Sequence, residues 1–274
     1  MELSFGIVSI FSITAALIGT YLLPTAVRRS LTFEYTDPTL ATAYTAHFVH
    51  FTPSHLFENL LAFVLASSVI VFLASRSNDR WFLIGFFTTL LFVLPLVLSF
   101  LNLAVPRDSV TYGFSGLNMA LVGFLPIALL RYVEYGRRDR MQPGVLPASF
   151  FVSALYISIV AVPPSQLSKV AFVTSTALGA VFTIRSGRSN PFRLGSLSER
   201  LRLIDPVVIV AGGVWVALLS AGFPDIVARD GSVINIYAHF VGYALSFMVA
   251  YLAHEWRLLG SEPGRELADR LRGL

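Results

Sequence analysis

The stretch TYGFSGLNMALVGF, residues 111–124, places a serine between glycines at the start of an apolar run. About 20 predominantly apolar residues are enough for a helix to cross a bilayer, and this run approaches that length. A hydroxyl group at such a position can cap the helix, bond to a neighbouring helix or act as a nucleophile. The role of Ser115 therefore depends on which other residues the fold brings to the same depth.

The composition indicates an all-α membrane protein, a polytopic helical bundle. Hydrophobic residues make up 55% of the 274 residues, charged residues only 13%, and the mean hydropathy is +0.71, whereas soluble domains carry about 25% charged residues. The sequence shows no barrel-like alternation, so helices are expected. The chain has no cysteine, which excludes disulfides and thiolate metal sites. The net charge of +4 is not taken as a sign of nucleic-acid binding, because the placement of Arg matters more here.

Apolar runs of about 18 residues or more are candidate membrane spans. We expect a single transmembrane domain over 1–256, followed by a short cytoplasmic tail at 257–274. The domain contains eight predicted spans, at 3–23, 53–75, 81–104, 113–131, 145–162, 167–184, 207–224 and 235–256.

The distribution of Lys and Arg predicts the orientation of these spans. Fifteen of the 20 basic residues fall in 76–80, 131–144, 185–206 and the tail, and five fall in the remaining segments. Cytoplasmic loops carry the excess of positive charge, so both termini are expected in the cytoplasm. The default location is the plasma membrane. The second, fourth and eighth spans then each run from the exterior to the cytoplasm.

Polar residues gather at the exterior ends of these three spans. His55 and Asn59 lie one helical turn apart in the second span, after Thr52 as a predicted cap and Pro53 as a residue suited to the first turn. Ionisable groups inside a membrane are costly, so each is a functional hypothesis. Ser115 begins the fourth span and His239 lies about one turn inside the eighth, so four polar groups share one depth.

A serine becomes a nucleophile when a base is within hydrogen-bonding reach, so the fourth and eighth spans would have to pack closely. Small residues allow this approach, and they begin beside the two polar groups, with Gly116 in one span and Ala238 and Gly242 in the other. The side chains of Asn59 and His55, together with the backbone N–H of Ser115, could form an oxyanion hole. One turn along, Asn118 is predicted to bond to a neighbouring helix.

Three motifs in this order resemble those of the rhomboid family of intramembrane serine proteases. They are GFSG at 113–116, HFTPSHLFEN at 50–59 and AHFVG at 238–242. The resemblance implies a six-helix core with about two extra helices. It also implies a Ser–His dyad without a cofactor or a metal.

In that dyad the nucleophile would be Ser115 and the general base His239. His55, Asn59 and the Ser115 amide would stabilise the oxyanion, Gly113 and Gly116 would belong to the serine motif, and His50 would have a supporting role. The implied substrates are transmembrane proteins of the lipid bilayer, cleaved in or beside their helices on the exterior side.

The sequence also departs from the family pattern. Three spans separate the serine and histidine motifs where the family has one, so 145–184 is interpreted as mostly an inserted hairpin. Met119 occupies the position of a frequent tyrosine, Ser246 replaces a glycine, and the Trp-Arg pair of the family's first loop is absent from 24–46.

Other interpretations remain open at this point. A rhomboid-like protein can bind membrane clients without cleaving them. A small-solute transporter is a further alternative, although no inverted repeat or matching pair of broken helices is visible. His47, His50 and His55 could suggest a metal site, but their spacing fits no zinc-binding helix. The loop at 225–234 is a candidate lid.

Overall fold

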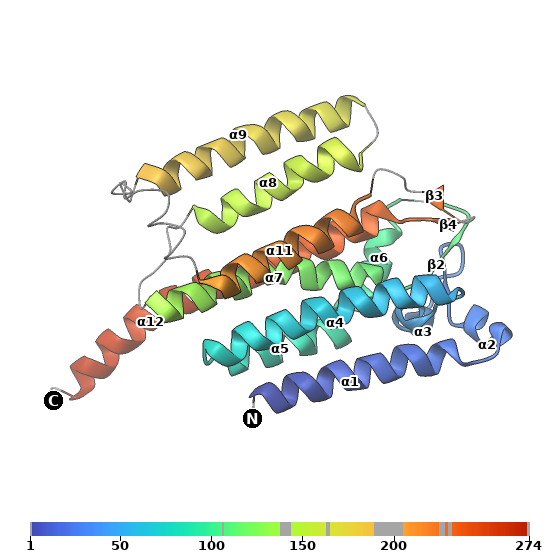
Figure 1. Ribbon diagram of the computed structural model, residues 1–274, viewed down its shortest axis with the longest axis horizontal. Helices are drawn as coiled ribbons and strands as arrows, with labels where there is room; N and C mark the ends of the chain where they lie inside the picture. The colour runs from blue at the N-terminus through green and yellow to red at the C-terminus, as the bar shows by residue number, and fades with distance from the viewer. Residues whose placement is uncertain are drawn as a thin grey trace.

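The computed structural model describes residues 2–105, 107–137, 144–162, 165–188, 205–224, 228–229 and 232–272, and helices dominate it (Figure 1). Two short antiparallel pairs join β1 (Phe33–Glu34) to β2 (Val110–Thr111) and β3 (Ala228–Arg229) to β4 (Ser232–Val233). A 3₁₀ turn, η1, covers Ala46–Phe48. The helices are α1 (Glu2–Tyr21), α2 (Thr25–Ser30), α3 (Leu40–Thr45), α4 (Pro53–Arg76), α5 (Arg80–Phe92), α6 (Leu94–Asn102), α7 (Ser115–Arg137), α8 (Val145–Val160), α9 (Gln166–Arg188), α11 (Pro206–Gly222) and α12 (Ile236–Arg272).

Several of these helices are long and apolar enough to cross a bilayer, as expected of an all-α membrane protein. Within the described ranges, four helices qualify: Leu3–Tyr21, Pro53–Arg76, Ser115–Gly136 and Ile236–Trp256. Three more apolar segments, in α8, α9 and α11, are shorter than 18 residues. The multi-pass architecture is therefore supported, and the total of eight spans stays a prediction.

The predicted span at 81–104 is divided into two helices, α5 and α6, which meet at a bend of 45°. Pro95, in the first turn of α6, explains the break, because proline lacks a backbone N–H and its ring clashes with the carbonyl four residues earlier. The two pieces together still have the length and composition of one span.

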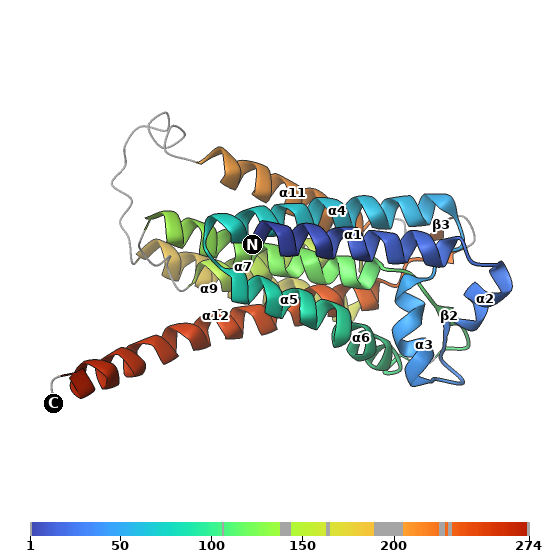
Figure 2. The ribbon, with the colours of Figure 1, turned by 90° about the horizontal axis from the view of Figure 1, so that it is seen from below.

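Helix α7 lies at the centre of the bundle and packs against α12, α4 and α11 (Figures 1 and 2). In the most apolar 18-residue stretch of α7, 83% is buried inside the bundle, whereas in the corresponding stretch of α1 only 17% is buried. A peripheral helix needs an apolar surface towards lipid, whereas α7 is surrounded by other helices. The helix that begins with Ser115 is therefore also the main core helix.

The segment interpreted as an inserted hairpin forms α8 and α9, which pack against each other on one side of the bundle (Figure 1). Its link to α12 includes a hydrogen bond that Tyr243 Oη donates to Ser153 Oγ, 2.8 Å away. By contrast, α11 packs against both α7 and α4. Of the described helices between the serine and the histidine, α11 packs most extensively against the central helix α7.

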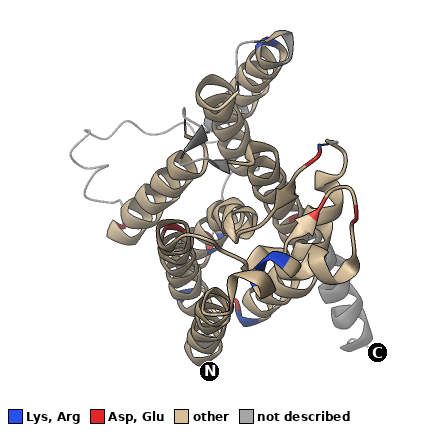
Figure 3. Cartoon of the chain, turned by 90° about the vertical axis from the view of Figure 1, so that its right-hand side faces the viewer, with Lys and Arg blue, Asp and Glu red and all other residues tan. Residues whose placement is uncertain are grey.

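The two ends of the bundle differ. The starts of α4, α7 and α12 lie at the end that carries α2, α3 and the short strands, and most of the ribbon seen from this end is neither acidic nor basic (Figure 3). The β1–β2 pair joins Phe33 to Thr111, so it ties the first loop to the segment just before Gly113.

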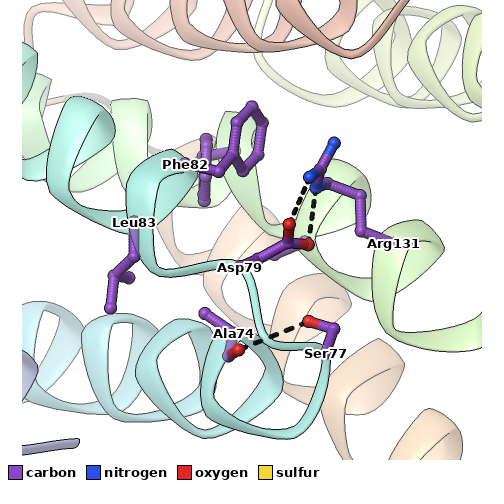
Figure 4. A pocket seen from close by; sticks show the side chains of 8 residues that line it. Ala74, Ser77, Asp79, Phe82, Leu83 and Arg131 are labelled. Atoms are coloured by element: carbon purple, nitrogen blue, oxygen red, sulfur yellow. Dashed lines mark hydrogen bonds and ion pairs between the residues drawn. The ribbon is translucent and has the colours of Figure 1, made fainter. Parts of the chain in front are cut away.

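The opposite end holds a buried ion pair between α7 and the turn after α4. Arg131 donates from Nε to Asp79 Oδ2 at 2.8 Å and from Nη2 to Asp79 Oδ1 (Figure 4). The guanidinium also lies over the ring of Phe82, 4.1 Å from its centroid. On α12, His254 accepts from Arg131 at 3.2 Å, and its other ring nitrogen lies 3.7 Å from Glu134. This network ties α7 and α12 together far from Ser115.

The predicted last span at 235–256 agrees with the apolar stretch Ile236–Trp256. Helix α12 continues beyond it without a break, so the tail is helical as far as Arg272. Most of the predicted loop at 185–206 lies outside the described residues, as do 225–227 and 230–231 of the candidate lid. The loop between α1 and α4 contains α2, α3 and η1.

Candidate active site

A glycine with a positive φ leads the chain into α7. Gly113 has a φ of +107°, a conformation that other residues rarely adopt. A Cβ atom there would also lie 2.8 Å from Cε1 of His55, too close for an ordinary contact. The Gly113 N–H donates to the carbonyl of Ala46 at 2.9 Å. Only glycine fits this turn. After the turn, α7 begins at Ser115, whose side chain is partly exposed.

His50 supports the same turn from the loop before α4. Its Nδ1–H donates to the carbonyl of Phe48 at 3.3 Å, and its Nε2 accepts from the N–H of Phe114 at 3.5 Å. Burial, helped by the neighbouring His55, lowers the pKa of His50 to about 3. The ring is therefore neutral, as accepting a bond at Nε2 requires. Its centroid lies 4.8 Å from that of His55.

Arg28 is a residue that the sequence analysis missed. Its Nη1 donates to the carbonyl of His50 at 2.6 Å, and its guanidinium lies over the rings of Tyr21 and Phe51, at 4.9 and 5.5 Å. One feature of the sequence pointed to it: Arg28 is among the five basic residues that fall outside the predicted cytoplasmic segments, where Lys and Arg are scarce. It fixes the backbone of the loop from which His50 projects.

The start of α4 forms as predicted. The Thr52 hydroxyl accepts from the N–H of His55 at 3.3 Å, and Pro53 occupies the first turn. Nδ2 of Asn59 donates to the carbonyl of His55 at 2.9 Å. Asn118 forms the interhelical bond that was predicted, with Nδ2 3.0 Å from both the carbonyl and Oδ1 of Asn59. These bonds join α4 to the first turn of α7.

Helices α7 and α12 touch through their backbones beside the two polar residues. A Cβ atom at Gly242 would overlap the carbonyl of Gly116. A Cβ atom at Gly116 would lie 3.8 Å from the carbonyl of Ala238. Because Ser115 precedes Gly116 and His239 follows Ala238, both side chains begin at this helix contact.

The imidazole of His239 is buried and held from α11. Its Nδ1–H donates to the carbonyl of Gly222 at 2.7 Å, and the ring of Phe223 meets it edge to face, with centroids 6.2 Å apart. This bond fixes the tautomer, so Nε2 carries a lone pair. Met119 fills the space beside Gly222, where a Cβ atom would overlap its sulfur. Gly222 was not predicted as a site residue, because it acts through its carbonyl.

The structure gathers Ser115, His239, Asn59, His55, His50, Gly113, Gly116, Ala238 and Gly242 at one end of the bundle. Among the hydrogen bonds of the described residues, none joins Ser115 to His239. His47 faces elsewhere, with Nε2 2.9 Å from the carbonyl of Pro95 and 3.0 Å from Ser99 Oγ. The three histidines of the first loop and α4 therefore do not converge on one point.

No protein-family model matches this chain, and a search of curated proteins found no significant match. The resemblance noted above therefore rests on the three motifs and on the arrangement of their residues.

Proposed function

We propose that this chain is an intramembrane serine endopeptidase that hydrolyses peptide bonds in or beside the transmembrane helices of other membrane proteins. The observation that carries the proposal is the backbone contact between Gly116 and Gly242. This contact brings the start of α7, with Ser115, next to the part of α12 that carries the buried His239.

The state of His239 supports its role as the general base. A general base needs a free lone pair near the hydroxyl, and the bond from Nδ1 to Gly222 leaves that lone pair on Nε2. Nε2 would remove the proton of Ser115 Oγ as the oxygen attacks the substrate carbonyl. The same proton would then pass to the leaving amine, and water would hydrolyse the ester in a second cycle.

The oxyanion of the tetrahedral intermediate needs donors. Asn59 Nδ2, the His55 ring and the backbone N–H of Ser115 are the candidates, and the bonds of Asn59 and Gly113 bring them to the start of α7. Loss of one such donor typically lowers the rate by about 10²–10³-fold. The proposed chemistry requires no cofactor.

The proposed setting follows from the charge distribution. With both termini in the cytoplasm, the ends of α4, α7 and α12 that carry the polar residues face the exterior of a plasma membrane. The partners would be transmembrane protein substrates within the bilayer.

A fluorophosphonate probe tests this proposal, because it phosphonylates activated serines. The detergent-solubilised protein should be labelled at Ser115. Ser115→Ala and His239→Ala should both remove the label. Ser67→Ala should keep it, because among the described residues this buried hydroxyl bonds only to carbonyls of its own helix, α4. An unlabelled wild-type protein that folds normally would contradict the proposal.

The second candidate is a rhomboid-like protein that binds membrane clients without cleaving them. It is favoured by the missing hydrogen bond between Ser115 and His239 among the described residues, and by Met119 in place of a tyrosine. In that case the probe should not react, while crosslinking within the bilayer should still capture transmembrane clients.

A further inference from the structure

Two buried asparagines on neighbouring helices form a pair beside the proposed oxyanion hole. Asn59 on α4 is 4% exposed and Asn118 on α7 is 2% exposed. Three bonds define the pair: Asn118 Nδ2 to the Asn59 carbonyl, Asn118 Nδ2 to Asn59 Oδ1, and Asn59 Nδ2 to the His55 carbonyl.

The chemistry of these bonds fixes which way both amides face. A backbone carbonyl can only accept, so the atom of Asn118 beside the Asn59 carbonyl must be its NH₂ group. That NH₂ group can bond only to an acceptor, so it selects the oxygen of the Asn59 side chain. The NH₂ group of Asn59 then faces the His55 carbonyl, which again can only accept.

A flipped Asn59 side chain would lose two of these three bonds. Its NH₂ group would face the NH₂ group of Asn118, and its oxygen would face the carbonyl of His55. A buried polar group without a partner is destabilising, so the observed orientation is strongly preferred. Among the described residues, Asn59 Nδ2 uses one hydrogen for the His55 carbonyl, and its second hydrogen has no acceptor.

We propose that Asn118 is a positioning residue: it holds Asn59 in the one orientation that presents an N–H donor to the oxyanion. The inference rests on the proposed function, since it assigns Asn59 a donor role. Asn118 itself does not touch the reacting atoms. It acts through Asn59, by binding the oxygen that would otherwise be free to face the substrate.

Asn118 carries an unfavourable feature that distinguishes a positioning role from a stabilising one. Its own side-chain oxygen is buried and has no partner among the described residues. Asn118→Leu removes that unsatisfied oxygen and leaves Asn59 Oδ1 unsatisfied in its place. One unpaired buried oxygen thus replaces another, so the thermal stability should change little, while the amide of Asn59 keeps only its bond to the His55 carbonyl.

The test uses the full-length protein in detergent, with a fluorophosphonate as the probe. The saturating labelling rate and the half-saturating concentration are measured separately. Asn118→Asp places an acceptor opposite Asn59 Oδ1 and should invert the amide, lowering the saturating rate 10- to 100-fold with little change in half-saturation. Asn118→Leu should lower the rate three- to tenfold. Ser67→Ala should label like the wild type.

A double-mutant cycle with Asn59→Ala provides the decisive comparison. If Asn118 acts through Asn59, Asn118→Asp should change the rate less than twofold in the Asn59→Ala background. The inference is overturned if Asn118→Asp labels at the wild-type rate, or if it lowers the rate equally with and without Asn59.

A readout that does not need activity separates this inference from the proposed function. The chain has six asparagines, so ¹⁵N-asparagine labelling gives few side-chain signals, and Asn59→Ala identifies that of Asn59. Asn118→Leu and Asn118→Asp should both shift the Asn59 signal. An unmoved signal overturns the positioning role, whereas a shifted signal in a protein that the probe never labels overturns only the protease function.

Discussion

The carbonyl of Gly222 holds the imidazole of His239, with 2.7 Å between the oxygen and Nδ1. The last residue of α11 thus fixes the tautomer of a histidine on α12. Met119 of α7 packs against the same glycine, so three helices meet at one carbonyl group.

This meeting point predicts coupling between Met119 and Gly222. Met119→Ala should destabilise the protein, by about 2–5 kcal/mol, because it leaves a cavity in the core. In Gly222→Ala the added methyl group overlaps the flexible end of Met119, which can move at a small cost. In the double variant the new methyl group fills part of the cavity. Thermal unfolding should therefore show a smaller loss than the sum of the single losses, and a strictly additive result would refute this packing.

The contact between α7 and α12 predicts a large effect of one methyl group. Gly242→Ala puts a Cβ atom into the carbonyl of Gly116, a backbone atom that cannot rotate away. The helices must separate, at a cost of about 1–3 kcal/mol. Thermal unfolding should detect the loss, and labelling at Ser115 should slow.

Gly212→Ala is the matched control for this change. Gly212 also lies in an apolar helix, α11, but a Cβ atom there meets nothing within 4 Å. Alanine is favoured over glycine in a helix, by about 1 kcal/mol, so this variant should be as stable as the wild type or more so. Equal melting temperatures for Gly242→Ala and Gly212→Ala would be incompatible with the observed helix contact.

The ion pair at the opposite end predicts a stability effect without a direct effect on the chemistry. Removing one partner from a buried ion pair typically costs about 3–5 kcal/mol, because the other charge stays buried. Arg131→Met should therefore lower the unfolding temperature strongly. Asp79→Asn in the same protein should recover part of the loss. The labelling rate of the folded fraction should match the wild type, and a slower rate would instead connect this network to the site.

The buried histidines predict a dependence of stability on pH. Burial lowers the pKa of His47 to about 4, from the ordinary value of 6.5. Between these values the unfolded chain binds a proton that the folded protein excludes, so stability falls as the pH drops from about 6.5 towards 4. His47→Gln removes this contribution and should flatten the curve in that window. The free energy of unfolding is measured at pH 5 and pH 7 for the wild type and for His47→Gln. If it changes by the same amount in both proteins, a neutral, buried His47 is excluded.

Hydropathy was sufficient to predict where the main helices lie, because burial and lipid exposure both demand apolar side chains. The boundaries of α4 were also predictable, since Thr52 and Pro53 are side-chain signals of a helix start. The bend between α5 and α6 was missed, although Pro95 is visible in the sequence. A proline in an apolar run can begin a helix or break one, and only the packing of both pieces decides which occurs.

The candidate site was predictable where it consists of side chains in motifs and unpredictable where it consists of backbone groups. Ser115, His239, Asn59 and His55 were predicted by residue type and depth. The carbonyls of Gly222 and His50 take part through bonds that any residue could make. Arg28 lies 22 positions before the histidine whose carbonyl it binds, and no local pattern connects the two.

Helix α11 has 17 residues and is about 26 Å long, from a rise of 1.5 Å per residue. A typical bilayer has a hydrocarbon core about 30 Å thick. Such hydrophobic mismatch is relieved by thinning the surrounding lipid or by shifting the helix. In the proposed eight-span arrangement, bilayer thickness would therefore act on the terminal carbonyl of α11, the same group that sets the direction of the His239 imidazole.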